Sequence, residues 1–228
     1  MGSKSVGIIL AAGSGKRMKS NIAKQYLLVH DKPVLYYSLK AFEDSEIDEM
    51  VLVLSEDMED YCRKNILELY QFNKITGIIY GGKERYDSVY NALKSIKDCG
   101  YVLVHDGARP CIQVETINRM LKEVQVSQAC VIGVPTKDTI KIVNDDNIVI
   151  ETPNRERVWN VQTPQAFQFD LLKKAHENLR LQKDIRVTDD AMVVETMLNV
   201  PVKMVEGDYS NIKVTTPEDL EIVKGFLM

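Results

Sequence analysis

The sequence predicts an α/β fold with one mostly parallel sheet, helices on both faces of the sheet and a protruding β-arm. Apolar, strand-like runs alternate with amphipathic helical runs over the first 135 residues. Some runs, such as VLVL at 51–54, are apolar throughout, as expected of strands buried on both faces. The alternation breaks at 136–160, where two short alternating strands flank the polar turn 144–147.

The first part of the chain supplies most of the predicted sheet. We expect strands at 6–11, 49–54, 75–80, 101–104 and 129–134. Pro33 stands at the first turn of a helix that continues through VLYYSLKAF. Residues 84–97 place Val89, Leu93 and Ile96 on one face of another helix, and a further helix is expected to begin near 114.

The part of the chain after the arm is predicted to be mostly helical. Helices are expected near 168–182 and 189–198, followed by a strand near 201–205. A last helix begins after Thr216, which is suited to the N-cap, with Pro217 at the first helical position and acidic residues in the first turn. We find no repeat and no linker, so residues 1–228 are predicted to form one domain with a hairpin arm.

Composition narrows the class of protein. The 228 residues carry a net charge of −4, which argues against a nucleic-acid or membrane-surface binder. No apolar run approaches the roughly 18 residues that a transmembrane helix needs. The four cysteines have no C-x-x-C pair, so neither a zinc framework nor a disulfide framework is expected, and a reduced, cytoplasmic protein is the simplest interpretation.

A glycine-rich turn follows the first predicted strand in the segment LAAGSGKRM at 10–18. Gly13 and Gly15 allow backbone N–H groups to approach phosphate oxygens closely. The segment is not a P-loop, and Met18 stands where a dinucleotide-binding motif has its third glycine. A phosphate site with Arg17 and Lys24 nearby is therefore favoured over a plain turn with solvated basic residues.

Two further turns follow predicted strands. GGKERYDS at 81–88 opens a helix, and its two glycines permit a close backbone approach. In HDGARP at 105–110, Asp106 is placed either to hold Mg²⁺ or to cap the next helix. His105 has no ligand partner at metal-binding spacing, so a structural role is favoured. Together, three turns of this kind describe a nucleoside triphosphate site.

Eight motifs follow one another over almost the whole chain. They are LAAGSGKRM (10–18), KQ (24–25), GGKERYDSV (81–89), HDGARP (105–110), KDTIK (137–141), QTPQAF (162–167), TDDA (188–191) and NIKVTTPEDL (211–220). On these motifs the sequence resembles the 2-C-methyl-D-erythritol 4-phosphate cytidylyltransferases of the non-mevalonate isoprenoid pathway. The resemblance implies a Rossmann-like fold of the nucleotidyltransferase type.

The resemblance also implies roles for individual residues. Arg17 and Lys24 are the catalytic cations, and Asp106 serves Mg²⁺ and the ribose region of CTP. The remaining nucleotide-binding positions are Ala11, Ala12, Gly13, Gly15, Gly81, Gly82, Arg85, Ser88 and Ala108, of which Gly82, Arg85 and Ser88 lie on the cytosine side. The sugar-phosphate positions are Arg109, Thr139, Arg155 and Lys213.

The reaction implied is CTP plus 2-C-methyl-D-erythritol 4-phosphate giving CDP-methylerythritol and pyrophosphate. Two alternatives remain at this point: a ribitol 5-phosphate cytidylyltransferase, and a non-catalytic nucleotide-binding protein with the same fold. The resemblance places Thr139 and Arg155 on the arm of a partner subunit. We therefore expect a homodimer that exchanges arms.

Overall fold

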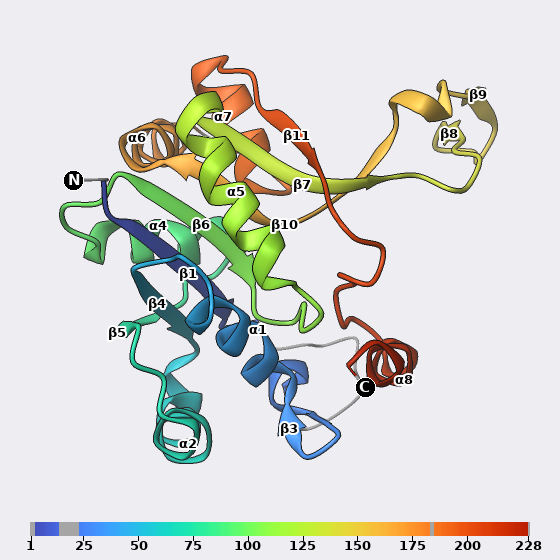
Figure 1. The fold of residues 1–228 in the computed structure, drawn as a ribbon. Helices are drawn as coiled ribbons and strands as arrows, with labels where there is room; N and C mark the ends of the chain where they lie inside the picture. The colour runs from blue at the N-terminus through green and yellow to red at the C-terminus, as the bar shows by residue number, and fades with distance from the viewer. Residues whose placement is uncertain (1–2, 14–22, 183–184, 228) are drawn as a thin grey trace.

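The computed structural model describes residues 3–13, 23–182 and 185–227 and is built on a seven-stranded sheet (Figure 1). The strand order is β11-β7-β10-β6-β1-β4-β5. β1 lies between β4 and β6 and runs parallel to both, and β4 is parallel to β5. The predicted mostly parallel sheet is confirmed.

The predicted strands appear within two residues of their expected limits. The inner strands combine β-branched or apolar residues with burial on both faces, which is typical of parallel sheets, whereas the two edge strands β5 and β11 are only partly buried. The strands are β1 (Ser5–Ala11), β4 (Glu49–Leu54), β5 (Ile75–Tyr80), β6 (Tyr101–Asp106), β7 (Ala129–Pro135) and β11 (Lys203–Glu206).

Helices cover both faces of the sheet. One face packs against α1 (Val34–Glu43), α5 (Val114–Ser127) and the helical stretch α2–η4–α3 (Glu59–Cys62, Arg63–Leu67 and Glu68–Tyr70). The other face packs against α4 (Arg85–Ser95), α6 (Phe169–Arg180) and α7 (Asp190–Leu198). Consecutive residues of β1 serve opposite faces: Ile8 packs under α4, and Ile9 packs under α1. Both faces of the sheet are thereby covered, and the carboxyl ends of its strands remain accessible for a ligand-binding site.

One long strand, β10 (Trp159–Gln168), was not expected from the sequence. It runs antiparallel between β6 and β7 and contains Pro164, which cannot donate a hydrogen bond to a sheet ladder. The pairing with β7 shifts register between Val161 and Gln165, and this irregularity accommodates the proline. Buried polar side chains, among them Gln162 and Gln165, hide the apolar signal of a central strand.

Pro33 lies one position earlier than predicted. It is the N-cap of α1 and pairs with Leu28 in a small sheet formed by β2 (Leu28–Val29) and β3 (Lys32–Pro33). Short 3-10 turns lie before this sheet at η2 (Lys24–Tyr26) and after β4 at η3 (Glu56–Met58).

The last helix, α8 (Pro217–Phe226), begins as predicted. Thr216 and Asp219 form a reciprocal capping box around Pro217. The helix packs on β2 through Val223 and Val29, which share a small buried cluster with Val214. This packing holds the segment before α8, which carries Lys213 and Thr215, beside the sheet edge.

The arm leaves the sheet after β7 and returns as η5 (Arg155–Arg157) and β10. Its tip consists of β8 (Ile142–Val143) and β9 (Val149–Glu151), which pair antiparallel across the predicted polar turn. Figure 1 shows this hairpin projecting away from the helices and the sheet. The chain thus carries a β8–β9 hairpin at the predicted position, and its role as an arm for a second subunit stays a prediction.

Candidate active site

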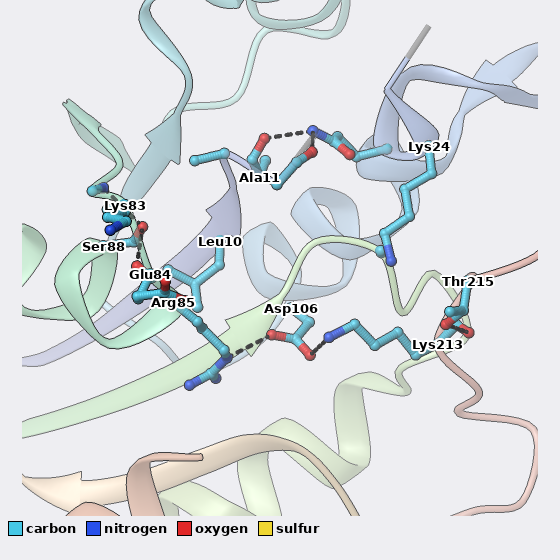
Figure 2. A pocket seen from close by; sticks show the side chains of 15 residues that line it. Leu10, Ala11, Lys24, Lys83, Glu84, Arg85, Ser88, Asp106, Lys213 and Thr215 are labelled. Carbon is cyan, nitrogen blue, oxygen red and sulfur yellow. Dashed lines mark hydrogen bonds and ion pairs between the residues drawn. The ribbon is translucent and has the colours of Figure 1, made fainter. Parts of the chain in front are cut away.

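Three strand ends border one pocket of about 480 Å³ at the carboxyl edge of the sheet. The pocket is lined by residues from the ends of β1 and β6, the turn after β5, η2 and the segment before α8. They are Leu10, Ala11, Ala12, Gly13, Lys24, Gln25, Gly82, Lys83, Glu84, Arg85, Ser88, Asp106, Ala108, Lys213 and Thr215 (Figure 2). Its size suits a small-molecule ligand. Most of the predicted nucleotide-binding residues therefore line one pocket.

The turn after β1 is tied to η2 by Gln25. This buried side chain donates from Nε2 to the carbonyl oxygens of Ala11 and Gly13, at 2.6 and 3.0 Å. The bonds hold Lys24 at the mouth of the same pocket, into which its side chain extends in Figure 2. Gly15 and Arg17 lie outside the described residues. Gln25 was part of a recognised motif, but its role becomes visible only in the fold.

The turn after β5 depends on small residues. A Cβ atom at Gly81 would lie 2.4 Å from the Cβ of Ala12, and one at Gly82 would lie 2.2 Å from the Cβ of Asp87. The Gly82 N–H donates to Oγ of Ser88 at 3.0 Å, which fixes the turn on the first turns of α4. The backbone therefore reaches the pocket without side chains in the way.

Asp106 lies at the centre of a cluster of cations. Its Oδ1 accepts from Arg85 Nε at 3.2 Å, and its Oδ2 accepts from Lys213 Nζ at 2.7 Å (Figure 2). Arg109 Nε lies 3.9 Å from the same Oδ2. Burial opposes ionisation of this carboxyl, but the charges of Arg85, Lys213 and Arg109 outweigh it and hold its pKa well below the usual range. Asp106 is thus a buried carboxylate, and it does not cap α5, whose N-cap is Gln113.

His105 is linked to Asp106 through Thr163. Burial lowers the pKa of His105 to about 3, so the ring is neutral at pH 7. Its Nε2 lies 3.3 Å from the carbonyl oxygen of Arg109, and its Nδ1 lies 3.1 Å from Oγ1 of Thr163. Thr163 in turn accepts from the backbone N–H of Asp106. This pattern fits a neutral ring that donates from Nε2, and a structural role for His105.

A second, smaller cavity of about 240 Å³ adjoins the first and shares Arg85, Asp106 and Lys213 with it. Arg109 lines this cavity too, and its Nη1 donates to the carbonyl oxygen of Asn211 at 2.8 Å. The rest of the lining comes from β10 and the segment before α7: Val161, Gln162, Thr163, Gln165, Thr188 and Asp189. Two of the predicted sugar-phosphate residues, Arg109 and Lys213, are thus brought together.

The other two predicted sugar-phosphate residues lie apart from both cavities in a single chain. Thr139 and Arg155 are exposed at the base of the arm, and Arg155 Nη1 donates to the carbonyl oxygen of Lys137 at 3.2 Å. Neither lines the two cavities described above.

A magnesium ion arriving with a nucleotide would have to use an oxygen of Asp106 that here contacts Arg85 or Lys213. Mg²⁺ is usually held by one or two carboxylates together with substrate phosphates, and Asp106 offers one carboxylate beside the pocket. Within residues 3–13, 23–182 and 185–227, no group of three or more His, Cys, Asp or Glu side chains gathers as a metal site. A metal cage made of protein ligands alone is therefore not seen in this part of the chain.

Two further sequence predictions can be compared with the structure. The four cysteines, Cys62, Cys99, Cys111 and Cys130, are free thiols in the structure. Across the described part of the chain, no helix has both the length and the apolar character that crossing a bilayer requires.

A Rossmann-like sheet with glycine-rich turns and a charged pocket at its carboxyl edge defines the class as an α/β nucleotidyltransferase. The family model for 2-C-methyl-D-erythritol 4-phosphate cytidylyltransferase matches residues 6–228. The chain belongs to this family.

Relatives and solved structures agree with the assignment. The 2-C-methyl-D-erythritol 4-phosphate cytidylyltransferase of Lachnoclostridium phytofermentans is 50% identical over 224 residues, covering 98% of this chain and 96% of the relative. That of Lachnospira eligens is 51% identical over 222 residues, covering 96% and 97%. The crystal structure of 4-diphosphocytidyl-2C-methyl-D-erythritol synthase from Anaerococcus prevotii gives a TM-score of 0.88 at 37% identity, covering 99% of this chain and 96% of that one.

Proposed function

We propose that this pocket is where CTP and 2-C-methyl-D-erythritol 4-phosphate react, with the nucleotide in the larger cavity and the sugar phosphate in the smaller one. The chain is a cytidylyltransferase of its family, and the reaction gives CDP-methylerythritol and pyrophosphate. This assignment rests on one observation. Arg85, Asp106 and Lys213 line both cavities and so form a wall between them. Two ligands bound there would meet at these side chains.

The sugar phosphate supplies the nucleophile in this proposal. A phosphate monoester has a second pKa near 6, so it is largely dianionic at pH 7 and needs no base to activate it. One of its oxygens forms a bond to the α-phosphorus of CTP, and the bond from that phosphorus to the bridging oxygen breaks. The electron pair leaves with pyrophosphate.

The task of the protein is then to bring anions together. Lys24 extends into the larger cavity, and Lys213 and Arg109 border the smaller one. Positive charge placed where negative charge develops is a large contribution to catalysis. We assign Lys24 and Arg17 to the phosphates of CTP, although Arg17 lies outside the described residues. Bound Mg²⁺ would neutralise phosphate charge, and Asp106 is the residue that would hold it.

The turns favour a small base. Because Gly81 already packs against Ala12, little space separates the turn after β5 from the end of β1. We therefore infer that Gly82 and Ser88 border the cytosine, and that CTP is preferred over ATP or GTP.

We also infer a homodimer in which Thr139 and Arg155 complete the sugar-phosphate site of the partner. The support is that neither residue lines the two cavities of its own chain, together with the exposed apolar hairpin that follows Thr139 along the arm. A cytoplasmic location is inferred from the four free cysteines.

Pyrophosphate release tests the proposed function. The protein is incubated with Mg²⁺ and CTP, and separately with 2-C-methyl-D-erythritol 4-phosphate, with ribitol 5-phosphate or with no acceptor. We expect release with methylerythritol phosphate only, and little release when ATP or GTP replaces CTP. Equal release with ribitol 5-phosphate would contradict the acceptor, and no release with any acceptor would contradict catalysis.

A further inference from the structure

A chain of polar side chains leads from Asp106 through the partly buried Arg85 to Asp190 and His176 in the core behind the pocket. The guanidinium of Arg85 contacts two carboxylates: Nε donates to Asp106 at 3.2 Å, and Nη1 donates to Oδ2 of Asp190 at 2.7 Å. The other oxygen of Asp190 lies 3.2 Å from Nε2 of His176. The side chains of Asp190 and His176 are 1% and 0% exposed. One arginine therefore connects the carboxylate of the pocket to a second carboxylate in the core.

Asp190 is itself fixed by rigid surroundings. It is the first residue of α7, where a carboxylate is favoured by the helix dipole. The backbone N–H groups of Asp190 and Ala191 donate to Oε1 of Gln165 on β10, each at 3.1 Å. The N-cap of α7 is Asp189, whose side chain accepts from Met192 N–H. Strand β10 and helix α7 thus hold the carboxylate of Asp190 against α4.

The electrostatics keep this arrangement charged. Burial alone would raise the pKa of Asp190, but the charge of Arg85 and the hydrogen bond with His176 outweigh it and lower that pKa. Burial likewise disfavours the charged form of Arg85, and the two carboxylates overcome this and raise its pKa. Asp190 therefore carries a negative charge in the folded protein and shares Arg85 with Asp106.

We propose that Asp190 is a positioning residue for cytidylyl transfer: it fixes the guanidinium of Arg85, which in turn orients the carboxylate of Asp106. This inference rests on the proposed function. Arg85 holds Oδ1 of Asp106, while Lys213 contacts Oδ2 (Figure 2). The two side chains are similarly exposed, at 28% for Arg85 and 36% for Lys213, but only Arg85 is also bound to the buried carboxylate of Asp190. Arg85 is thus the fixed support of Asp106, and Lys213 is the partner that has room to turn toward a substrate.

If Asp190 only held helices together, removing another ion pair between α4 and its neighbouring helices should have the same effect. The chain has such a pair. Arg180 of α6 contacts Asp87 of α4 at 2.5 Å, and its side chain is 35% exposed. This pair also joins helices but does not touch Asp106. Arg180→Gln is therefore a matched control that removes an ion pair on α4 and leaves the support of Asp106 intact.

The test compares Asp190→Asn, Arg85→Met, the double variant and Arg180→Gln. For each we measure kcat, the KM of both substrates and the thermal unfolding midpoint. We expect Asp190→Asn to lower kcat about 10- to 100-fold, the range found when a partner that orients a metal-binding side chain is removed. The KM for the sugar phosphate stays within about threefold, because Asp190 does not line that cavity. Arg180→Gln keeps kcat within about twofold.

The double variant distinguishes positioning from an independent contribution. If Asp190 acts through Arg85, adding Asp190→Asn to Arg85→Met changes kcat by less than about twofold. Multiplied losses in the double variant, or an unchanged kcat in Asp190→Asn, would overturn the proposal. If Asp190→Asn alone does not fold, the comparison of Arg85→Met with the double variant still decides, because the double variant removes the negative charge that Arg85→Met leaves unpaired at Asp190. An inactive parent enzyme would contradict the proposed function instead.

Discussion

At the scale of single residues, the contacts in the pocket depend on the direction in which its long side chains point. Sequence motifs identified Asp106, Lys24 and Lys213 because strand ends and loops carry them to one edge of the sheet. They could not show that the guanidinium of Arg85, expected beside the cytosine, contacts Asp106 and Asp190. Nor did TDDA at 188–191 show that Asp190 is buried, because the direction of a side chain depends on helices α4, α6 and α7 packing together.

Lys24 is predicted to act mainly on the chemical step. Replacing it with alanine removes positive charge from the place where the α-phosphate gains negative charge, so we expect kcat to fall ~10²–10³-fold. The KM for the sugar phosphate should change far less, because Lys24 does not line the smaller cavity. Steady-state kinetics on Lys24→Ala measures both. Lys40→Ala, which removes an equal charge from the surface of α1, is the control, and a Lys24→Ala enzyme with the kcat of the parent would exclude the assignment.

Asp48 is predicted to contribute stability that depends on pH. Its Oδ2 accepts from the backbone N–H and the hydroxyl of Ser5, at 2.8 and 2.7 Å, and these bonds lower its pKa. A carboxyl with a lowered folded-state pKa stabilises the protein above the unfolded pKa of about 3.9, and this contribution is lost as pH falls through the folded value. Asp48→Asn should therefore be less stable than the parent at pH 7, by on the order of 1 kcal/mol because the side chain is exposed.

Urea unfolding at pH 7 and at pH 3 checks this prediction. The difference in unfolding free energy between parent and Asp48→Asn should shrink at pH 3, which lies below the unfolded pKa of Asp48, because the unfolded parent then takes up a proton that the folded parent binds less readily. A difference that is equal at both pH values would show that the charge of Asp48 contributes nothing.

At the scale of elements, regular alternation made most of the sheet predictable. The parallel strands are apolar runs bounded by turns, so their limits follow from the sequence within two residues. Strand β10 was not predicted, because Pro164 and the buried glutamines do not fit the apolar pattern of a central strand. Its polar residues have a physical reason, since Gln165 bonds the start of α7 and Thr163 bonds Asp106. A strand that contributes polar residues to a functional site therefore lacks the apolar sequence pattern of a strand that only packs in the core.

The turn between β5 and α4 is predicted to require glycine at position 82. A methyl group there would lie 2.2 Å from the Cβ of Asp87, so the backbone must shift and the bond to Ser88 is weakened. Loss of about 1.4 kcal/mol of binding corresponds to a tenfold effect, and we expect Gly82→Ala to raise the KM for CTP about tenfold.

Gly77→Ala provides the matched control for this turn. Gly77 lies in β5, and a Cβ atom there would meet nothing within 4 Å. Kinetics should therefore be unchanged in Gly77→Ala. Equal CTP kinetics in Gly82→Ala and the parent would show that the turn adapts without cost to the nucleotide site.

At the scale of the whole molecule, the arm exposes apolar side chains that nothing in a single chain covers in the described structure. Its tip exposes Ile142, Val143, Ile148, Val149 and Ile150, which are between 42% and 64% accessible to solvent. An apolar hairpin of this kind marks an interaction surface. The sequence predicted the hairpin from its alternating pattern, but its position relative to a second copy depends on contacts between chains, which the fold of one chain does not contain. Reciprocal exchange in a two-fold dimer would bury the tip and deliver Thr139 and Arg155 to the neighbouring site.

In the proposed dimer, the nucleotide half of each site comes from one chain and Arg155 comes from the arm of the other. Complementation between two inactive variants tests it most directly. Lys24→Ala chains and Arg155→Ala chains are mixed under conditions that exchange subunits, and pyrophosphate release is compared with that of each variant alone. As a control, Lys24→Ala is mixed with Asp106→Asn, a pair in which both lesions fall in the nucleotide half.

A shared site predicts that activity returns in the first mixture and not in the control. Each mixed dimer then contains one intact site, with Lys24 and Asp106 from one chain and Arg155 from the other, so random exchange restores roughly a quarter of the parental activity. If mixed dimers form but the first mixture remains as inactive as its components, each chain builds its own site, and the account of a shared active site is wrong.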